Sequence, residues 1–99
     1  MLSINKTAEG GELIFTLEGR LDTITAPELE KELKDSLDGA DTLVLDFEKL
    51  TYLSSAGLRV LLSAQKVMAK KGEMKLIHVN ETIMEIFEVT GFTDILTIV

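Results

Sequence analysis

The sequence contains no cysteine and no tryptophan, and it has one histidine and one proline in 99 residues. Without cysteine, disulfides, thiolate nucleophiles and zinc–thiolate sites are excluded. The one histidine, His78, cannot form a multi-histidine metal site, and a catalytic triad would need a serine and a carboxylate beside it. An ordinary histidine at the end of a strand is the simpler expectation. We therefore expect no catalytic residue, no metal and no cofactor.

Basic residues are also few. Ten lysines and arginines stand against 17 aspartates and glutamates, for a net charge of −7. Nucleic acids and anionic membranes both require a basic surface, so neither is an expected partner. No apolar run approaches 18 residues and no basic segment precedes an apolar one at the N-terminus, which predicts no signal peptide and no membrane insertion. These features favour a cytoplasmic protein of one domain, residues 1–99.

Short β-prone runs are spread along the chain. Residues 2–6 and 13–17 flank Ala-Glu-Gly-Gly, which predicts an opening hairpin with glycines at the turn. Residues 42–47 form an apolar run typical of a strand buried on both faces. Residues 74–79 and 95–99 are further β-prone runs.

Helical patterns alternate with these strands. Thr25-Ala26-Pro27-Glu28 predicts a helix start in which Thr25 caps the amide of Glu28, and leucines at four-residue spacing continue to a stop at Gly39. A second helix is expected from the Ser54 region to Lys71, and a third that Asn80 caps and Gly91 ends. The alternation predicts an α/β fold, with a mixed β-sheet, an opening hairpin and crossover helices packed on the sheet.

The segment Ser54-Ser55-Ala56-Gly57 joins the apolar strand to the second helix. Free amides and the helix dipole attract anions at such a junction. A glycine in a first helical turn is costly, and close backbone approach is one reason to keep it. From spacing alone, Ser54 is simply an N-cap and Ser55 a filler of the first turn. The segment has neither the Gly-Lys-Ser/Thr ending of a phosphate-binding loop nor the Gly-x-Ser-x-Gly of a nucleophile elbow.

Two stretches resemble a known family. Residues 43–47, Leu-Val-Leu-Asp-Phe, and residues 50–62, Leu-Thr-Tyr-Leu-Ser-Ser-Ala-Gly-Leu-Arg-Val-Leu-Leu, resemble the signature of STAS domains, particularly the stand-alone bacterial anti-sigma factor antagonists. Residues 19–23 and 26–29 are similar to the other recurring segment of that family. The resemblance extends over nearly the whole chain.

This resemblance implies a partner-switching function. In the family, the unphosphorylated protein binds an anti-sigma factor that is also a serine kinase, which frees the sigma factor. Phosphorylation of the antagonist ends the complex, and a serine phosphatase resets it. The acceptor serine of the family corresponds to Ser55 here. The implied partner-binding residues are Asp22, Thr23, Ser54, Ser55, Ala56, Gly57 and Arg59.

Three positions depart from the commonest family pattern. Ser54 replaces the aspartate before the acceptor, which makes Ser54 a rival acceptor and removes a charge that a kinase could recognise. Ala56 follows the acceptor, and Arg59 replaces a glycine. A cation in the first turns of a helix opposes the dipole by roughly 0.3–1 kcal/mol. Arg59 therefore either pairs with a phosphate on Ser55 one turn earlier or lies across exposed apolar surface.

Two other functions use the same fold class. The weakened motif also fits a non-phosphorylated STAS subunit of a lipid-transport ATPase or of a larger signalling assembly. A phospho-aspartate receiver is a poorer fit, because Asp46 follows a central strand but no acidic pair follows the first strand.

Overall fold

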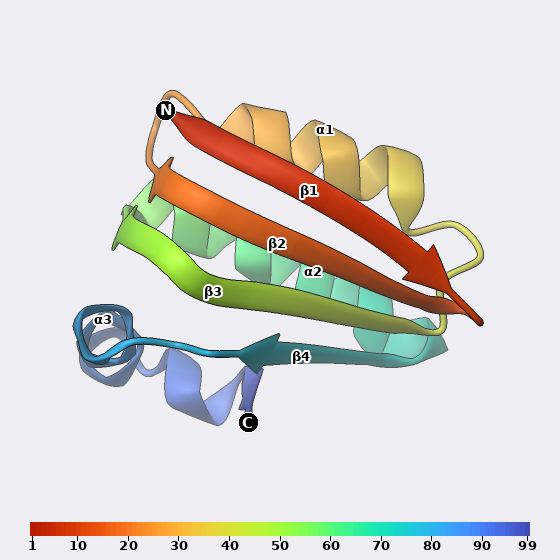
Figure 1. Ribbon diagram of the computed structural model, residues 1–99. Helices are drawn as coiled ribbons and strands as arrows, with labels where there is room; N and C mark the ends of the chain where they lie inside the picture. Colours follow the sequence, from red (N-terminus) through yellow and green to blue (C-terminus); the bar gives the residue numbers. More distant parts are fainter.

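The computed structural model describes all 99 residues as five strands and three helices (Figure 1). In chain order the elements are β1 (Leu2–Glu9), β2 (Glu12–Leu21), α1 (Ala26–Ser36), β3 (Thr42–Leu53), α2 (Ser55–Lys71), β4 (Glu73–Ile77), α3 (Glu81–Thr90), a 3₁₀ turn (Phe92–Asp94) and β5 (Thr97–Ile98). None of the three helices combines the length and the hydrophobicity that a membrane span requires.

The sheet is mixed, with strands in the order β1-β2-β3-β4-β5. The β1–β2 pair is antiparallel, and every later pair is parallel. A helix therefore connects each successive pair of parallel strands. This arrangement confirms the predicted α/β fold with an opening hairpin and crossover helices.

The helices cover one face of the sheet (Figure 1). Strand residues that alternate toward this face are buried, as in Leu13, Phe15 and Leu17 of β2. Phe47 of β3 faces the same way and packs against Phe87 of α3, with ring centroids 6.2 Å apart. The opposite face of the sheet is not covered by any helix.

The strand predicted at residues 42–47 is confirmed, but its expected burial on both faces holds only in part: Val44 is buried on the second face, which no helix covers. Leu43, Leu45 and Phe47 are buried beneath the helices, but Asp46 is only partly buried on the uncovered face. The strand also continues to Leu53, because Leu50 and Leu53 keep packing into the core.

The segment before α1, residues 19–24, is partly strand. β2 runs on to Leu21 through register irregularities on either side of Gly19. A Cβ on Gly19 would lie 2.2 Å from the Met1 carbonyl oxygen, and the φ of this residue is 107°. Gly19 therefore allows the start of β1 to approach β2 closely.

The predicted side-chain cap of α1 is wrong. Thr25 makes no side-chain cap to the helix. Its hydroxyl instead accepts from the amide of Asp22 and donates to the carbonyl of Arg20, at 2.9 and 2.8 Å. The predicted cap of α3 is confirmed, because the Asn80 side chain accepts from the amide of Ile83.

Candidate partner-binding site

The start of α2 distinguishes the two neighbouring serines. Ser54 is the N-cap, with extended backbone, and its hydroxyl accepts from the amide of Gly57 at 3.3 Å. Its own amide donates to the carbonyl of Leu21 at 2.9 Å, which ties the end of β2 to the start of the helix. The sequence-based interpretation of Ser54 as an N-cap is therefore confirmed.

Ser55 is the first residue of α2 and is exposed. Its hydroxyl makes no hydrogen bond within the protein, unlike that of Ser54. The amides of a first helical turn have no intrahelical acceptors, and the dipole there favours negative charge. The Ser55 hydroxyl is thus free to react or to be covered by a partner, at a place where an added anion is tolerated.

Gly57 sets how closely this turn approaches the sheet. A Cβ at this position would lie 2.7 Å from Cδ1 of Leu53 and 2.8 Å from Cγ of Leu21. Both leucines are buried, so there is no room for a side chain. Close approach, the reason expected from the sequence, explains this glycine. It holds the first turn of α2 against the ends of β2 and β3.

The loop before α1 lies beside this turn, and Asp22 organises it. The Asp22 carboxylate accepts from the amides of Ile24 and Thr25, both at 3.0 Å. These hydrogen bonds, the one from Thr25 foremost, lower the pKa of the Asp22 carboxyl from its ordinary value of 3.8. Asp22 therefore acts mainly within the loop, while Thr23 and Ile24 are left exposed.

A shallow depression joins the loop to the helix. Thr23 lines it from the loop, Pro27 from α1, and Ala56 and Arg59 from α2. Three residues predicted from the sequence therefore share one surface next to Ser55. The Arg59 side chain is exposed and forms no ion pair, so its guanidinium is available to an anion. Pairing with a phosphate on Ser55 and lying across apolar surface both stay predictions for Arg59.

Two exposed apolar residues near this surface were not predicted as site residues from the sequence. Ile24 is 82% exposed at the tip of the loop, and Tyr52 is 39% exposed near the end of β3. Arg20 lies over the Tyr52 ring at 4.1 Å from its centroid and 3.7 Å from the Asp22 carboxylate. An isoleucine between two threonines in a connecting loop was the available signal for Ile24, and it is a weak one because single apolar side chains are common on protein surfaces.

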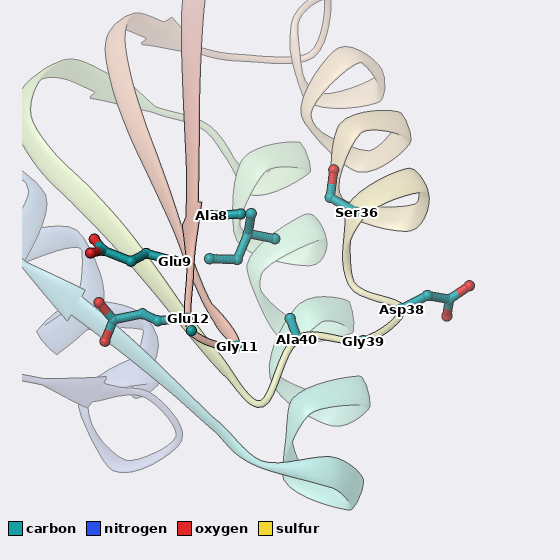
Figure 2. Close-up of a pocket in the computed structure, with 10 residues that line it drawn as sticks. Ala8, Glu9, Gly11, Glu12, Ser36, Asp38, Gly39 and Ala40 are labelled. Atoms are coloured by element: carbon teal, nitrogen blue, oxygen red, sulfur yellow. The ribbon is translucent and has the colours of Figure 1, made fainter.

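A second hollow lies at the other end of the sheet, between the β1–β2 turn and the segment after α1 (Figure 2). The carboxylates of Glu9 and Glu12 point to one side of it and that of Asp38 to the other (Figure 2). No lysine, arginine or histidine lines it, and its carboxylates point apart, so this hollow offers no convergent chemistry. The start of α2 remains the candidate site.

The only histidine does not contribute to this site. The polar side chains that His78 contacts are Asp46 and Glu48, and no serine hydroxyl is among its partners. A serine–histidine arrangement of the triad type is therefore absent from the structure.

Comparison with known proteins identifies the fold family. The sequence pattern of the STAS domain matches residues 3–99. The chain belongs to the STAS domain family. This confirms the family predicted from the motifs around Ser55 and Asp22.

Relatives of this STAS domain are anti-sigma factor antagonists, in agreement with the predicted function. BtrV of Bordetella bronchiseptica, a protein classed with these antagonists, is 41% identical over 87 residues, which cover 86% of this chain and 75% of BtrV. The crystal structure of an anti-sigma factor antagonist from Mycobacterium paratuberculosis is 20% identical with a TM-score of 0.90, covering 99% of this chain and 85% of that one. The Bacillus protein SpoIIAA in its phosphorylated form is 17% identical with a TM-score of 0.76, covering 98% and 91%. At these identities the two structures establish the shared fold.

Proposed function

We propose that this STAS domain is an anti-sigma factor antagonist whose unphosphorylated form binds a serine-kinase anti-sigma factor and thereby releases the sigma factor. Phosphorylation of Ser55 ends the complex, and a serine phosphatase restores the binding form. The observation that carries the proposal is the free, exposed hydroxyl of Ser55 at the start of α2, beside a Ser54 hydroxyl that caps the helix.

The difference between the two serines favours Ser55 as the acceptor. A phosphate on Ser54 would remove the cap from the Gly57 amide, and loss of an N-cap costs about 0.5–2 kcal/mol. A phosphate on Ser55 breaks no hydrogen bond of the folded protein. It adds about −1.5 to −2 charges where the helix dipole favours an anion. The fold should therefore remain intact after modification.

The same phosphate is expected to disrupt the partner complex. The binding face would comprise Ser55, the exposed Thr23 and Ile24 of the loop, and the surface around Ala56 and Arg59. A solvated dianion at the centre of a packed interface loses its hydration without full compensation. Dissociation then follows from charge and desolvation, with no refolding of the antagonist.

The proposal is tested with the cognate anti-sigma kinase and ATP, followed by mass spectrometry of the product. We expect one phosphate on Ser55 in the parent and in Ser54→Ala, and none in Ser55→Ala. Ser55→Asp should bind the kinase at least about tenfold more weakly while keeping the parental circular dichroism spectrum. Ser55→Asn is the matched uncharged control, and it should retain more binding than Ser55→Asp.

Other outcomes would point elsewhere. Modification of Ser54 alone would assign the switch to the rival serine. Absence of phosphate from both serines would remove the switch and favour the structural-subunit function, for which a transporter ATPase should co-purify with the chain in place of a kinase.

A further inference from the structure

A second cluster of functional side chains lies on the uncovered face of the sheet. Asp46 and Glu48 alternate to this face along β3, and His78 follows directly after β4. The register pairs Asp46 with Ile77, which places His78 next to both carboxylates. His78 Nδ1 is 3.0 Å from Asp46 Oδ1 and 3.9 Å from Glu48 Oε2. One potential ligand atom of each residue lies within 4.8 Å of the other two.

The charge in this cluster is not balanced by any strong cation. No lysine or arginine forms an ion pair with Asp46 or Glu48, and their only potential cationic partner is His78. The chain as a whole carries a net charge of −7, which adds to the attraction for a cation. Asp46 is also oriented, because its Oδ1 accepts from the Glu48 amide at 3.0 Å.

The separations suit a small metal ion. Donor atoms bound at about 2.0–2.2 Å in a tetrahedron lie roughly 3.3 Å from one another. The two distances from His78 Nδ1, 3.0 and 3.9 Å, lie on either side of that value. The side chains of His78 and Glu48 are 56% and 68% exposed, so both can rotate to complete the geometry.

We propose that Asp46, Glu48 and His78 form a site for a divalent transition-metal cation of the Zn²⁺ type, with a water or a partner's side chain as the fourth ligand. One imidazole nitrogen with two carboxylates is a donor set that Zn²⁺ and its neighbours accept. Ca²⁺ is disfavoured because it takes six to eight oxygen ligands, whereas the cluster supplies only two carboxylates. Mg²⁺ is disfavoured because it prefers an all-oxygen shell, and the imidazole nitrogen of His78 suits a transition metal instead.

Binding would join two parts of the chain. The metal replaces the contact between His78 Nδ1 and Asp46, and it links the centre of β3 to the segment between β4 and α3. The sequence does not predict this site, because His78 and Asp46 lie 32 positions apart and only the sheet brings them together. It is independent of the Ser55 switch and does not require it.

The test is a titration of the full chain with ZnCl₂ in a non-coordinating buffer, followed by calorimetry and by ¹H–¹⁵N NMR. We expect one Zn²⁺ per chain, a large shift of the His78 Nδ1 resonance, and amide shifts centred on residues 46–48 and 78. Zn²⁺ should also raise the melting temperature of the parent, because it binds only the folded form of the site. A molar excess of Mg²⁺ should not displace it.

Three variants make the result specific. His78→Asn removes the imidazole at a backbone φ of 56°, a conformation that asparagine tolerates well, and should weaken binding by at least about tenfold. Glu48→Gln should also weaken Zn²⁺ binding. It should leave the fold intact, because Glu48 is exposed. Glu12→Gln removes the same charge from the same face outside the cluster, so it should leave the affinity unchanged.

Several results would overturn the proposal. One is a parent that shows no shift at His78 in millimolar Zn²⁺. Another is binding that His78→Asn and Glu48→Gln leave intact. A third is an equal loss in Glu12→Gln, which would reduce the effect to general attraction by the net charge.

Discussion

Replacing Gly57 by alanine tests the packing on which the binding site depends. The new methyl group would meet Leu53 and Leu21 at 2.7 and 2.8 Å, closer than non-bonded carbons can lie. Forcing extra atoms into a packed core costs about 1–3 kcal/mol. Alanine in a helix offsets about 1 kcal/mol of this relative to glycine. We therefore expect a net loss of about 1 kcal/mol in the free energy of unfolding.

The measurement is thermal or urea unfolding of Gly57→Ala beside the parent. A loss of about 1 kcal/mol lowers the melting temperature of a domain this size by about 4–8 °C. The sign decides the matter, because helix propensity alone predicts that alanine stabilises. A melting temperature equal to or above that of the parent would refute the close approach of α2 to the sheet.

A double-mutant cycle with Leu21→Ala locates the clash. Alone, Leu21→Ala should cost about 2–5 kcal/mol, because Leu21 is fully buried. In the Gly57→Ala background it should cost less, since the alanine methyl then occupies space that the leucine left. Strict additivity of the two substitutions would show that the methyl group does not contact Leu21.

Three further outcomes follow from the site. Ser54→Ala should lower the free energy of unfolding by about 0.5–2 kcal/mol through loss of the cap, whereas Ser55→Ala should change it by less than about 0.5 kcal/mol, as measured by urea unfolding. Ile24→Ala should weaken partner binding by about tenfold or more in calorimetry, since burying an isoleucine contributes about 1.5–3 kcal/mol, and should leave the melting temperature unchanged because Ile24 is 82% exposed. Because the pKa of Asp22 is lowered on folding, its ionised form stabilises the fold at neutral pH, and this contribution should fade as the pH falls below 3.8 toward the folded-state pKa. Asp22→Asn should be less stable than the parent at pH 7, and the two melting curves should converge in acid; a constant difference at all pH values would contradict the role given to its charge.

Local signals predicted most of the elements. Gly10-Gly11 marked the hairpin, the four-residue spacing of leucines marked α1, and Asn80 with Gly91 bounded α3. Such patterns depend on residues close together in the sequence, so they can be recognised without knowledge of tertiary contacts. The predictions that failed are those that tertiary contacts overrode. Thr25 could cap α1 by its position, but its hydroxyl is used by Asp22 and Arg20, which the fold brings within reach.

The site shows the same division. The serine pair at the strand–helix junction and its STAS-like motif identified where the function lies. Only the structure separated the capping Ser54 from the free Ser55, because both residues satisfy the same spacing rule. The structure also showed that Ile24 and Tyr52 are exposed, whereas the sequence alone would suggest that these apolar side chains lie in the core.

By itself, the sequence determined the fold class, the family and the segment that carries the site, because these depend on patterns of burial, turns and motifs along the chain. The tertiary structure alone decided which serine hydroxyl is free, why Gly57 has no room for a side chain, and that Asp46, Glu48 and His78 meet. Those facts depend on distances between residues up to 36 positions apart, from Leu21 to Gly57, and such distances are set by strand register and helix packing.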